Sequence, residues 1–278
     1  MKAIISHDID HITVSEHLLR DMIVPKFMVR TNIELALGKI GWQEYFLRWN
    51  DFLKNKWQNI DELIAFNKTK NIPSAFFIGV DKGIGLNYSN NAAAVWTNRI
   101  LEQGETVGIH GICFQNLEKV KNEKQCFEKA FNIKPKGMRM HYVKRNENTL
   151  NYFNEAGYLY DTTVHAYQNP YKVGAMWEFP FQIMDGWIIE NGKKWQCRNL
   201  EECKEATKKS IEKAFENNLN YIGIDFHDRY FSKSFKTWID WYIWLCDYLI
   251  ENKIAFTSFE NAMSELESQA QTKLQATL

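Results

Sequence analysis

The sequence predicts a single α/β domain whose largely parallel sheet closes into a distorted (β/α) barrel. Short apolar runs alternate with amphipathic stretches along nearly the whole chain, which is the pattern of strand–helix units in a parallel sheet. About seven or eight such units fill the 278 residues, and no linker, repeat or low-complexity segment separates them. One barrel therefore explains the length better than two domains.

The expected strands are apolar runs bounded by Gly, Pro and polar residues, at 2–6, 74–80, 105–109, 137–142, 158–162, 175–183, 221–226 and 255–259. The expected helices lie between many of these runs and carry apolar residues at intervals of three and four, at about 59–70, 92–103, 116–131, 147–156, 200–217 and 235–252. The last of these helices is very apolar but contains Asp240 and Asp247 and is short for a membrane span, so we interpret it as a buried helix.

Two segments lie outside this alternation. Residues 13–55 follow the first strand and carry aromatic residues at helical spacing, so we expect a helical insertion that covers the functional site. The barrel is expected to span 1–264, with a polar helical tail over 265–278.

The composition excludes several classes of function. Lys plus Arg and Asp plus Glu both number 34, so the net charge does not indicate nucleic acid or an anionic membrane as partner. The five cysteines include no CxxC pair, which argues against a disulfide framework and against a thiolate zinc site. A strand begins almost at once and no secretory signal pattern precedes it, so we expect a cytoplasmic protein without a transmembrane segment.

The most informative feature is the end of the first strand, which reads His7-Asp8-Ile9-Asp10-His11. Strand side chains alternate between faces, so Asp8 and Asp10 point the same way while His7 and His11 point away. Two carboxylates on one face repel each other unless a cation or a shared proton lies between them. The pattern therefore indicates a metal site or a base next to a ligand.

Ionisable residues also end four later strands. They are His110, the alternating pair Arg139 and His141, Asp161, and the group Asp225, His227 and Asp228. The carboxyl ends of barrel strands converge on one rim, where active sites are built. We therefore expect Asp8, Asp10, His110, Arg139, His141 and His227 to share one pocket.

In order and spacing, these segments resemble the polysaccharide deacetylase (NodB-homology) family, and most closely its divergent O-antigen biosynthesis subgroup of the WbmS type. The resemblance covers nearly the whole chain. It is carried by His7-Asp8-Ile9-Asp10, Val107-Gly108-Ile109-His110-Gly111, Arg139-Met140-His141-Tyr142, 156–163, Trp177-Glu178-Phe179-Pro180 and Asp225-Phe226-His227-Asp228.

The resemblance implies a hydrolase that removes N-acetyl or O-acetyl groups from sugars with a divalent metal, commonly zinc. It implies that Asp8 is the general base, that Arg139 orients it, and that His227 is the general acid. Asp10 and His110 would be metal ligands. The implied partner is an acetamido sugar, a sugar nucleotide or a lipid-linked saccharide. We expect Tyr142, Asp161 and Asp228, at the same rim, to contact it.

One position departs from the family pattern. The second histidine of the family's His-x-x-x-His metal motif should lie four residues after His110, where this chain has Phe114. A catalytic zinc ion normally has three protein ligands, so another residue must replace it. His141 is the candidate, because it leaves the same rim. A histidine at position 114 would pair with His110 only if the intervening turn were helical.

Two other functions are compatible with these residues. An Asp-x-Asp motif after an apolar strand also begins haloacid-dehalogenase-type phosphatases, in which the first Asp is a nucleophile and magnesium is bound. Here Ile12 stands where that family has Thr or Val. The second alternative is a sugar-binding protein on a deacetylase fold that has lost catalysis, which Phe114 favours.

Overall fold

One curled sheet of ten strands organises the molecule, which is known here from a computed structural model that describes residues 1–18, 22–83 and 85–275. The strand order is β6-β7-β5-β4-β3-β2-β1-β9-β8, and β10 pairs with β1 off this path. The strands are β1 (Lys2–Ile9), β2 (Ser74–Ile78), β3 (Thr106–Gly111), β4 (Gly137–Met140), β5 (Tyr160–Asp161), β6 (Tyr171–Val173), β7 (Met176–Glu178), β8 (Ile183–Met184), β9 (Tyr221–Asp225) and β10 (Ala255–Phe256).

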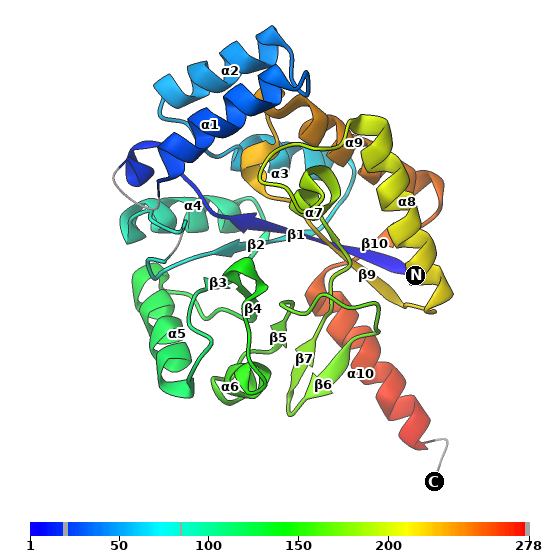
Figure 1. Ribbon diagram of the computed structural model, residues 1–278. Coiled ribbons are helices and arrows are strands. Elements are labelled where there is room, and N and C mark those ends of the chain that lie inside the picture. The colour runs from blue at the N-terminus through cyan, green and yellow to red at the C-terminus, as the bar shows by residue number, and fades with distance from the viewer. Residues whose placement is uncertain (19–21, 84, 276–278) are drawn as a thin grey trace.

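All pairings among these strands are parallel except that of β6 with β7. The sheet curls into a half-barrel with helices around its outside (Figure 1). These helices are α3 (Ile60–Thr69), α4 (Asn90–Glu102), α5 (Leu117–Phe131), α6 (Thr149–Glu155), α7 (Asp185–Glu190), α8 (Leu200–Glu216) and α9 (Lys236–Glu251). This architecture confirms the predicted single α/β domain of the distorted-barrel type.

The interior of the half-barrel is apolar at its lower end. Inward-facing residues of the strands form a separate cluster with the start of α10 (Phe259–Gln275), whose Phe259 stacks on Tyr160 with ring centroids 4.4 Å apart. Gly137 makes room for this packing, because a Cβ at that position would lie 2.1 Å from the Tyr160 ring. The polar residues at the carboxyl ends of the strands lie beyond this apolar cluster.

The insertion after β1 is helical, with a short turn η1 (Ser15–His17) and the antiparallel helices α1 (Ile23–Ala36) and α2 (Trp42–Leu53). Residues 19–21 of the expected insertion lie outside the described residues. The pair lies over the carboxyl end of β1 (Figure 1). In the described residues no helix is both long and apolar enough to cross a membrane.

The strand β6 and the helix α7 have no expected counterpart, and the structure differs from the expected elements in three further places. The run 175–183 divides into β7 and β8, because β7 pairs with β5 whereas β8 pairs with β9. The strand expected to reach Tyr142 ends at Met140. The helix expected as a tail from 265 already begins at Phe259, and Glu265 still binds Lys2 and Tyr221; residues 276–278 lie outside the described residues.

Candidate active site

Asp10, His110 and His141 meet at the carboxyl end of the sheet. Asp10 Oδ1 lies 3.2 Å from His110 Nε2 and 3.3 Å from His141 Nδ1, and the two imidazole nitrogens are 2.9 Å apart. Asp10 follows β1, His110 is on β3 and His141 follows β4, so three strands supply one side chain each. Both histidines are buried, whereas the Asp10 side chain is 21% exposed. The group opens toward solvent on the Asp10 side.

The donor atoms of this group suit a divalent metal ion. His110 Nδ1 lies 3.2 Å from the carbonyl oxygen of Arg139, which needs a proton on that nitrogen, so the Nε2 lone pair faces the group. Asp10 Oδ1 is buried and has no hydrogen-bond donor among the described residues. One carboxylate oxygen and two imidazole nitrogens that converge in this way form a ligand set typical of zinc.

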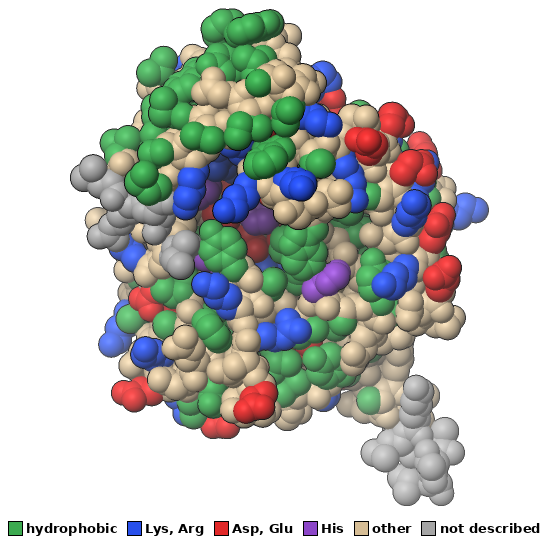
Figure 2. Space-filling model, in the orientation of Figure 1, with side chains coloured by type: hydrophobic (Ala, Val, Ile, Leu, Met, Phe, Trp, Pro, Cys, Tyr) green, Lys and Arg blue, Asp and Glu red, His purple; other side chains and the backbone are tan. Residues whose placement is uncertain are grey.

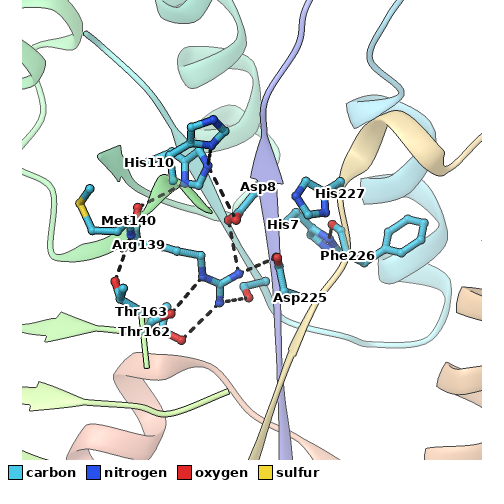
Figure 3. A network of polar contacts seen from close by, with 12 residues as sticks. His7, Asp8, His110, Arg139, Met140, Thr162, Thr163, Asp225, Phe226 and His227 are labelled. Carbon is cyan, nitrogen blue, oxygen red and sulfur yellow. Dashed lines mark hydrogen bonds and ion pairs between the residues drawn. The ribbon is translucent and has the colours of Figure 1, made fainter. Parts of the chain in front are cut away.

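Arg139 holds Asp8 beside this group (Figure 3). Its Nη1 lies 3.3 Å from Asp8 Oδ1 and 2.5 Å from Asp225 Oδ1, and its Nη2 donates to Ser6 Oγ at 2.7 Å. Burial lowers the pKa of Arg139, but Asp225 and Asp8 outweigh it and raise that pKa, so the guanidinium stays charged. A buried cation that is fixed by several acceptors can orient Asp8 without moving.

Asp225 is the second carboxylate on Arg139, and it is fully buried. Burial and the nearby Asp8, against the opposing effect of Arg139, raise its pKa to about 7. Asp8 is 3% exposed and lies on the side of Arg139 that faces His110, whose Nε2 is 3.8 Å from Asp8 Oδ2. Of the two carboxylates, Asp8 is thus the one next to the histidine group.

His227 faces Asp10 from the opposite wall, with its Nε2 3.7 Å from Asp10 Oδ2. Asp185 fixes the ring from behind, because its Oδ1 lies 2.8 Å from His227 Nδ1 and its Oδ2 accepts from the His227 backbone amide at 2.9 Å. Burial lowers the pKa of His227, but Asp185, Asp225 and Asp10 outweigh it and raise that pKa well above its usual range. The imidazole therefore carries a proton at neutral pH and directs Nε2 into the site.

The segment after His110 is extended rather than helical. The backbone amides of Ile112 and Cys113 donate to the carboxylate of Glu123, at 2.8 and 3.2 Å, and α5 begins only at Leu117. Amides that are bound to a side chain are not available for helical hydrogen bonds. Phe114 instead packs against the main apolar core, so position 114 does not stand one helical turn from His110.

His141 reaches the site through a turn rather than through strand alternation. The strand ends at Met140, and the next two residues after His141, Tyr142 and Val143, have positive φ values of 56° and 49°. The Tyr142 side chain is 56% exposed, and its ring centroid lies 4.0 Å from that of His141. Tyr142 is therefore accessible beside the histidine group, and its contact with a substrate stays a prediction.

Asp161 and Asp228, the other two expected substrate contacts, are fully buried. The carboxylate of Asp161 accepts from Thr163 Oγ1 at 2.7 Å and is hydrogen-bonded to the carboxyl of Glu178. Burial raises the pKa of Glu178 well above its usual range, and Asp161 raises it further, so the pair shares a proton. Thr163 Oγ1 in turn accepts from the Met140 amide at 3.0 Å, next to His141. Through Thr163, Asp161 thus stabilises the backbone at Met140, just before the turn that carries His141. The prediction that Asp161 contacts the substrate directly does not fit its burial.

Asp228 takes part in the packing beneath the insertion. Its Oδ2 accepts from the Asn59 amide at 3.1 Å, and burial raises its pKa to about 8. Direct substrate contact by Asp228 does not fit this burial.

The histidines that flank Asp8 and Asp10 in the sequence, His7 and His11, lie outside the Asp10 group. His7 Nδ1 is 2.8 Å from the carbonyl oxygen of Phe226, and His11 Nδ1 is 2.9 Å from His17 Nε2.

The sequence analysis gave no role to two residues of this site, Asp185 and Asp225. Asp225 was recognised as a charged strand end, but nothing in one strand shows which carboxylate faces a distant arginine. Asp185 follows the apolar run 175–183 by two residues, and Asp8 follows the run 2–6 at the same interval. A carboxylate just after an apolar run is the signal that could have identified it.

No family model and no curated protein sequence matches the chain. Solved structures do. A protein assigned as a polysaccharide deacetylase from Mycobacterium smegmatis superimposes with a TM-score of 0.64 at 12% identity, over 97% of this chain and 91% of that chain. PuuE allantoinase superimposes with a TM-score of 0.56 at 14% identity, over 73% of this chain and 70% of that chain. The chain has the polysaccharide deacetylase fold.

A structure from the O-antigen subgroup is among the matches, but its superposition does not bear on the narrower resemblance. A protein from Bordetella bronchiseptica assigned to O-antigen biosynthesis (WbmS) matches with a TM-score of only 0.41 at 11% identity, over 86% of this chain and 77% of that chain. At such identities the deacetylase fold is established but the reaction is not, and the allantoinase shows that one fold supports different substrates.

Proposed function

We propose that this protein is a metal-dependent hydrolase that removes an N-acyl group, such as acetyl, from a sugar of surface-polysaccharide biosynthesis. The observation that carries the proposal is the Asp10–His110–His141 group, which lies between Asp8 on Arg139 and His227 on Asp185. A ligand set, a base and an acid on opposite sides of one opening are the parts that amide hydrolysis needs.

The three ligands would hold a divalent ion, for which zinc is our choice. When bound, that ion would lower the pKa of a water molecule and polarise the acyl carbonyl. Asp8 would accept the proton of the attacking water, because it is oriented by Arg139 and lies next to His110. His227 would donate its Nε2 proton to the departing amine, and Asp185 would stabilise the imidazolium until then.

An aromatic ring and a lysine at the opening favour a charged sugar derivative as substrate. Tyr142 is exposed beside His141, and an aromatic ring at this position can stack on a sugar face. Lys144 lies over the same ring, with its Nζ 5.6 Å from the centroid, and adds a positive charge at the entrance. An acetamido sugar linked to a nucleotide or to a lipid phosphate fits both features.

The test is release of acetate from a panel of free, nucleotide-linked and lipid-linked acetamido sugars, with the zinc-loaded protein. The Asp8→Asn variant should retain zinc but lose at least a hundredfold in kcat, since removing a general base costs on the order of 10²–10⁴. Asp81→Asn, a half-buried aspartate outside the group, is the control. Full activity of Asp8→Asn would show that the base is wrongly assigned.

The same panel distinguishes the two alternatives. Binding of an acetamido sugar by wild-type protein without acetate release would favour a sugar-binding protein that has lost catalysis. Release of phosphate with magnesium would favour the phosphatase, in which Asp8 would be a nucleophile. The pairing of Asp8 with Arg139, rather than with a lysine, argues against the phosphatase.

A further inference from the structure

The helix pair α1–α2 buries charged residues beside Phe27 and exposes several large apolar ones. The buried residues of α2 are Glu44 and Arg48, and α1 buries Glu34 among its inward residues. Arg48 forms ion pairs with both glutamates and donates from Nε to the carbonyl oxygen of Ser234 at 2.7 Å. The polar sides of the helices thus attach the pair to the body of the protein.

The apolar sides point outward. On α2, Trp42, Phe46 and Leu53 are 65%, 62% and 80% exposed, at spacings of four and seven residues that place them on one stripe. Val29 and Leu37 of α1 are 58% and 56% exposed. Eight of the fifteen exposed large hydrophobic side chains of the described residues fall within 18–53. Figure 2 shows this apolar surface over α1 and α2 at the top of the molecule.

The charges that remain on the outside of the pair are positive. Between residues 22 and 56, all of which the structure describes, Lys26 and Lys54 are exposed, and Lys39 and Lys56 are half-buried. Of the acidic residues of this range, Asp51 is half-buried, and Glu34 and Glu44 are buried. The apolar stripe is therefore flanked by lysines without an exposed carboxylate, although the net charge of the whole chain is zero.

The inner side of the pair contacts segments that lie next to the candidate site. Arg30 of α1 binds Glu190 at 2.8 Å, and its guanidinium lies over the ring of Tyr230, three residues after His227. Figure 2 shows the surface hollowed below α1 and α2, with histidine and carboxylate atoms visible in the hollow. The hollow therefore lies directly below the helix pair that carries the outer stripe.

We propose that the outer surface of α1–α2 binds an anionic phospholipid bilayer. Outward Trp, Phe and Leu with flanking lysines are the features of helices that lie in the membrane interface. A second copy of this chain fits less well, since a symmetric contact would bring the lysines of both copies into one interface without an exposed carboxylate. The bilayer would then bring a lipid-linked saccharide to the entrance. Binding itself does not depend on the proposed deacetylation.

The proposal is tested by co-sedimentation of the full-length protein with vesicles of phosphatidylglycerol and phosphatidylcholine. We expect binding that increases with the phosphatidylglycerol fraction and decreases with salt. The triple variant Trp42→Ser/Phe46→Ser/Leu53→Ser should bind at least tenfold more weakly. Its matched control is Val95→Ser/Phe215→Ser/Ile250→Ser, whose native side chains are 63%, 52% and 45% exposed on α4, α8 and α9. This control should bind like wild type.

A charge test complements the apolar one. Lys39→Glu/Lys54→Glu should weaken binding to phosphatidylglycerol vesicles, whereas Lys121→Glu/Lys134→Glu, on and after α5, should have a much smaller effect. Equal losses in the two triple variants, or no binding of wild-type protein, would overturn the proposal. A lipid-free dimer at micromolar concentration that the Trp42 triple variant dissociates would assign the surface to self-association instead. Acetate release from a soluble acetamido sugar should persist in the triple variant, which separates this test from that of the proposed function.

Discussion

Asp185 binds His227 twice, through the ring nitrogen Nδ1 at 2.8 Å and through the backbone amide at 2.9 Å. The two bonds fix both the position of the ring and its tautomer, so Nε2 can only face Asp10. A carboxylate that is fully buried and bound in this way acts through the histidine rather than on the substrate. Asp185 is therefore a positioning residue.

The Asp185→Asn variant should narrow the pH range of activity. Asp185 raises the pKa of His227, so its loss should lower that pKa and deprotonate the proposed acid at alkaline pH. We expect kcat/KM to fall by at least tenfold at pH 8 and by less at pH 6. The pH–rate profile of the zinc-loaded variant measures this shift. A uniform loss at all pH values, with the alkaline limb unmoved, would contradict the assignment.

Replacing His141 should release the metal. Loss of one of three protein ligands should weaken zinc binding by at least tenfold, or about 1.4 kcal/mol, in the His141→Ala variant. Titration calorimetry and metal analysis measure the effect. His165→Ala, an exposed histidine outside the group, is the control. Unchanged zinc affinity in His141→Ala would make His141 a substrate contact.

A histidine at position 114 should not restore the family's motif. The amides after His110 bind Glu123, so the segment is extended and a side chain at 114 does not turn back toward Asp10. The Phe114→His variant should therefore bind zinc within about twofold of wild type. In the His141→Ala background it should not rescue binding. Rescue there would mean that the segment rearranges into a helical turn.

The Glu178–Asp161 pair should make stability depend on pH. The pKa of Glu178 is raised in the folded protein, so the folded state holds a proton that the unfolded state releases above its ordinary pKa of 4.5. Between these two values, stability should fall by about 1.4 kcal/mol per pH unit because of this group. Urea unfolding at several pH values should show that Glu178→Gln removes this contribution. The exposed Glu102→Gln control should keep the wild-type slope.

The sequence predicted the strand ends better than the contacts between them. Period-two alternation correctly placed Asp8 and Asp10 on one face and turned His7 and His11 away, because β1 is regular to Ile9. Alternation did not describe His141, since β4 ends one residue earlier and a left-handed turn follows. Asp185 was not found because its partner lies 42 residues away, on another strand end.

The orientation of the insertion was also hidden in the sequence. Helical spacing of the aromatic residues predicted helices, but spacing alone does not tell which side faces the protein. The buried ion pairs of Arg48 decide that question, and they depend on Glu34 of the other helix. Likewise, the net charge is a sum over the whole chain, so a value of zero does not indicate that lysines lie together on the outer surface of α1–α2.

The three proposed ligands, Asp10, His110 and His141, come from separate strands. Asp10 and His141 are 131 residues apart in the chain. During synthesis, the ion would have no complete binding site until the chain has passed residue 141 and β1, β2, β3 and β4 have paired in register. Zinc would thus be acquired after the sheet forms rather than guide its formation, unlike zinc in small metal-nucleated domains. Once bound, it would tie the first half of the sheet together and slow its opening.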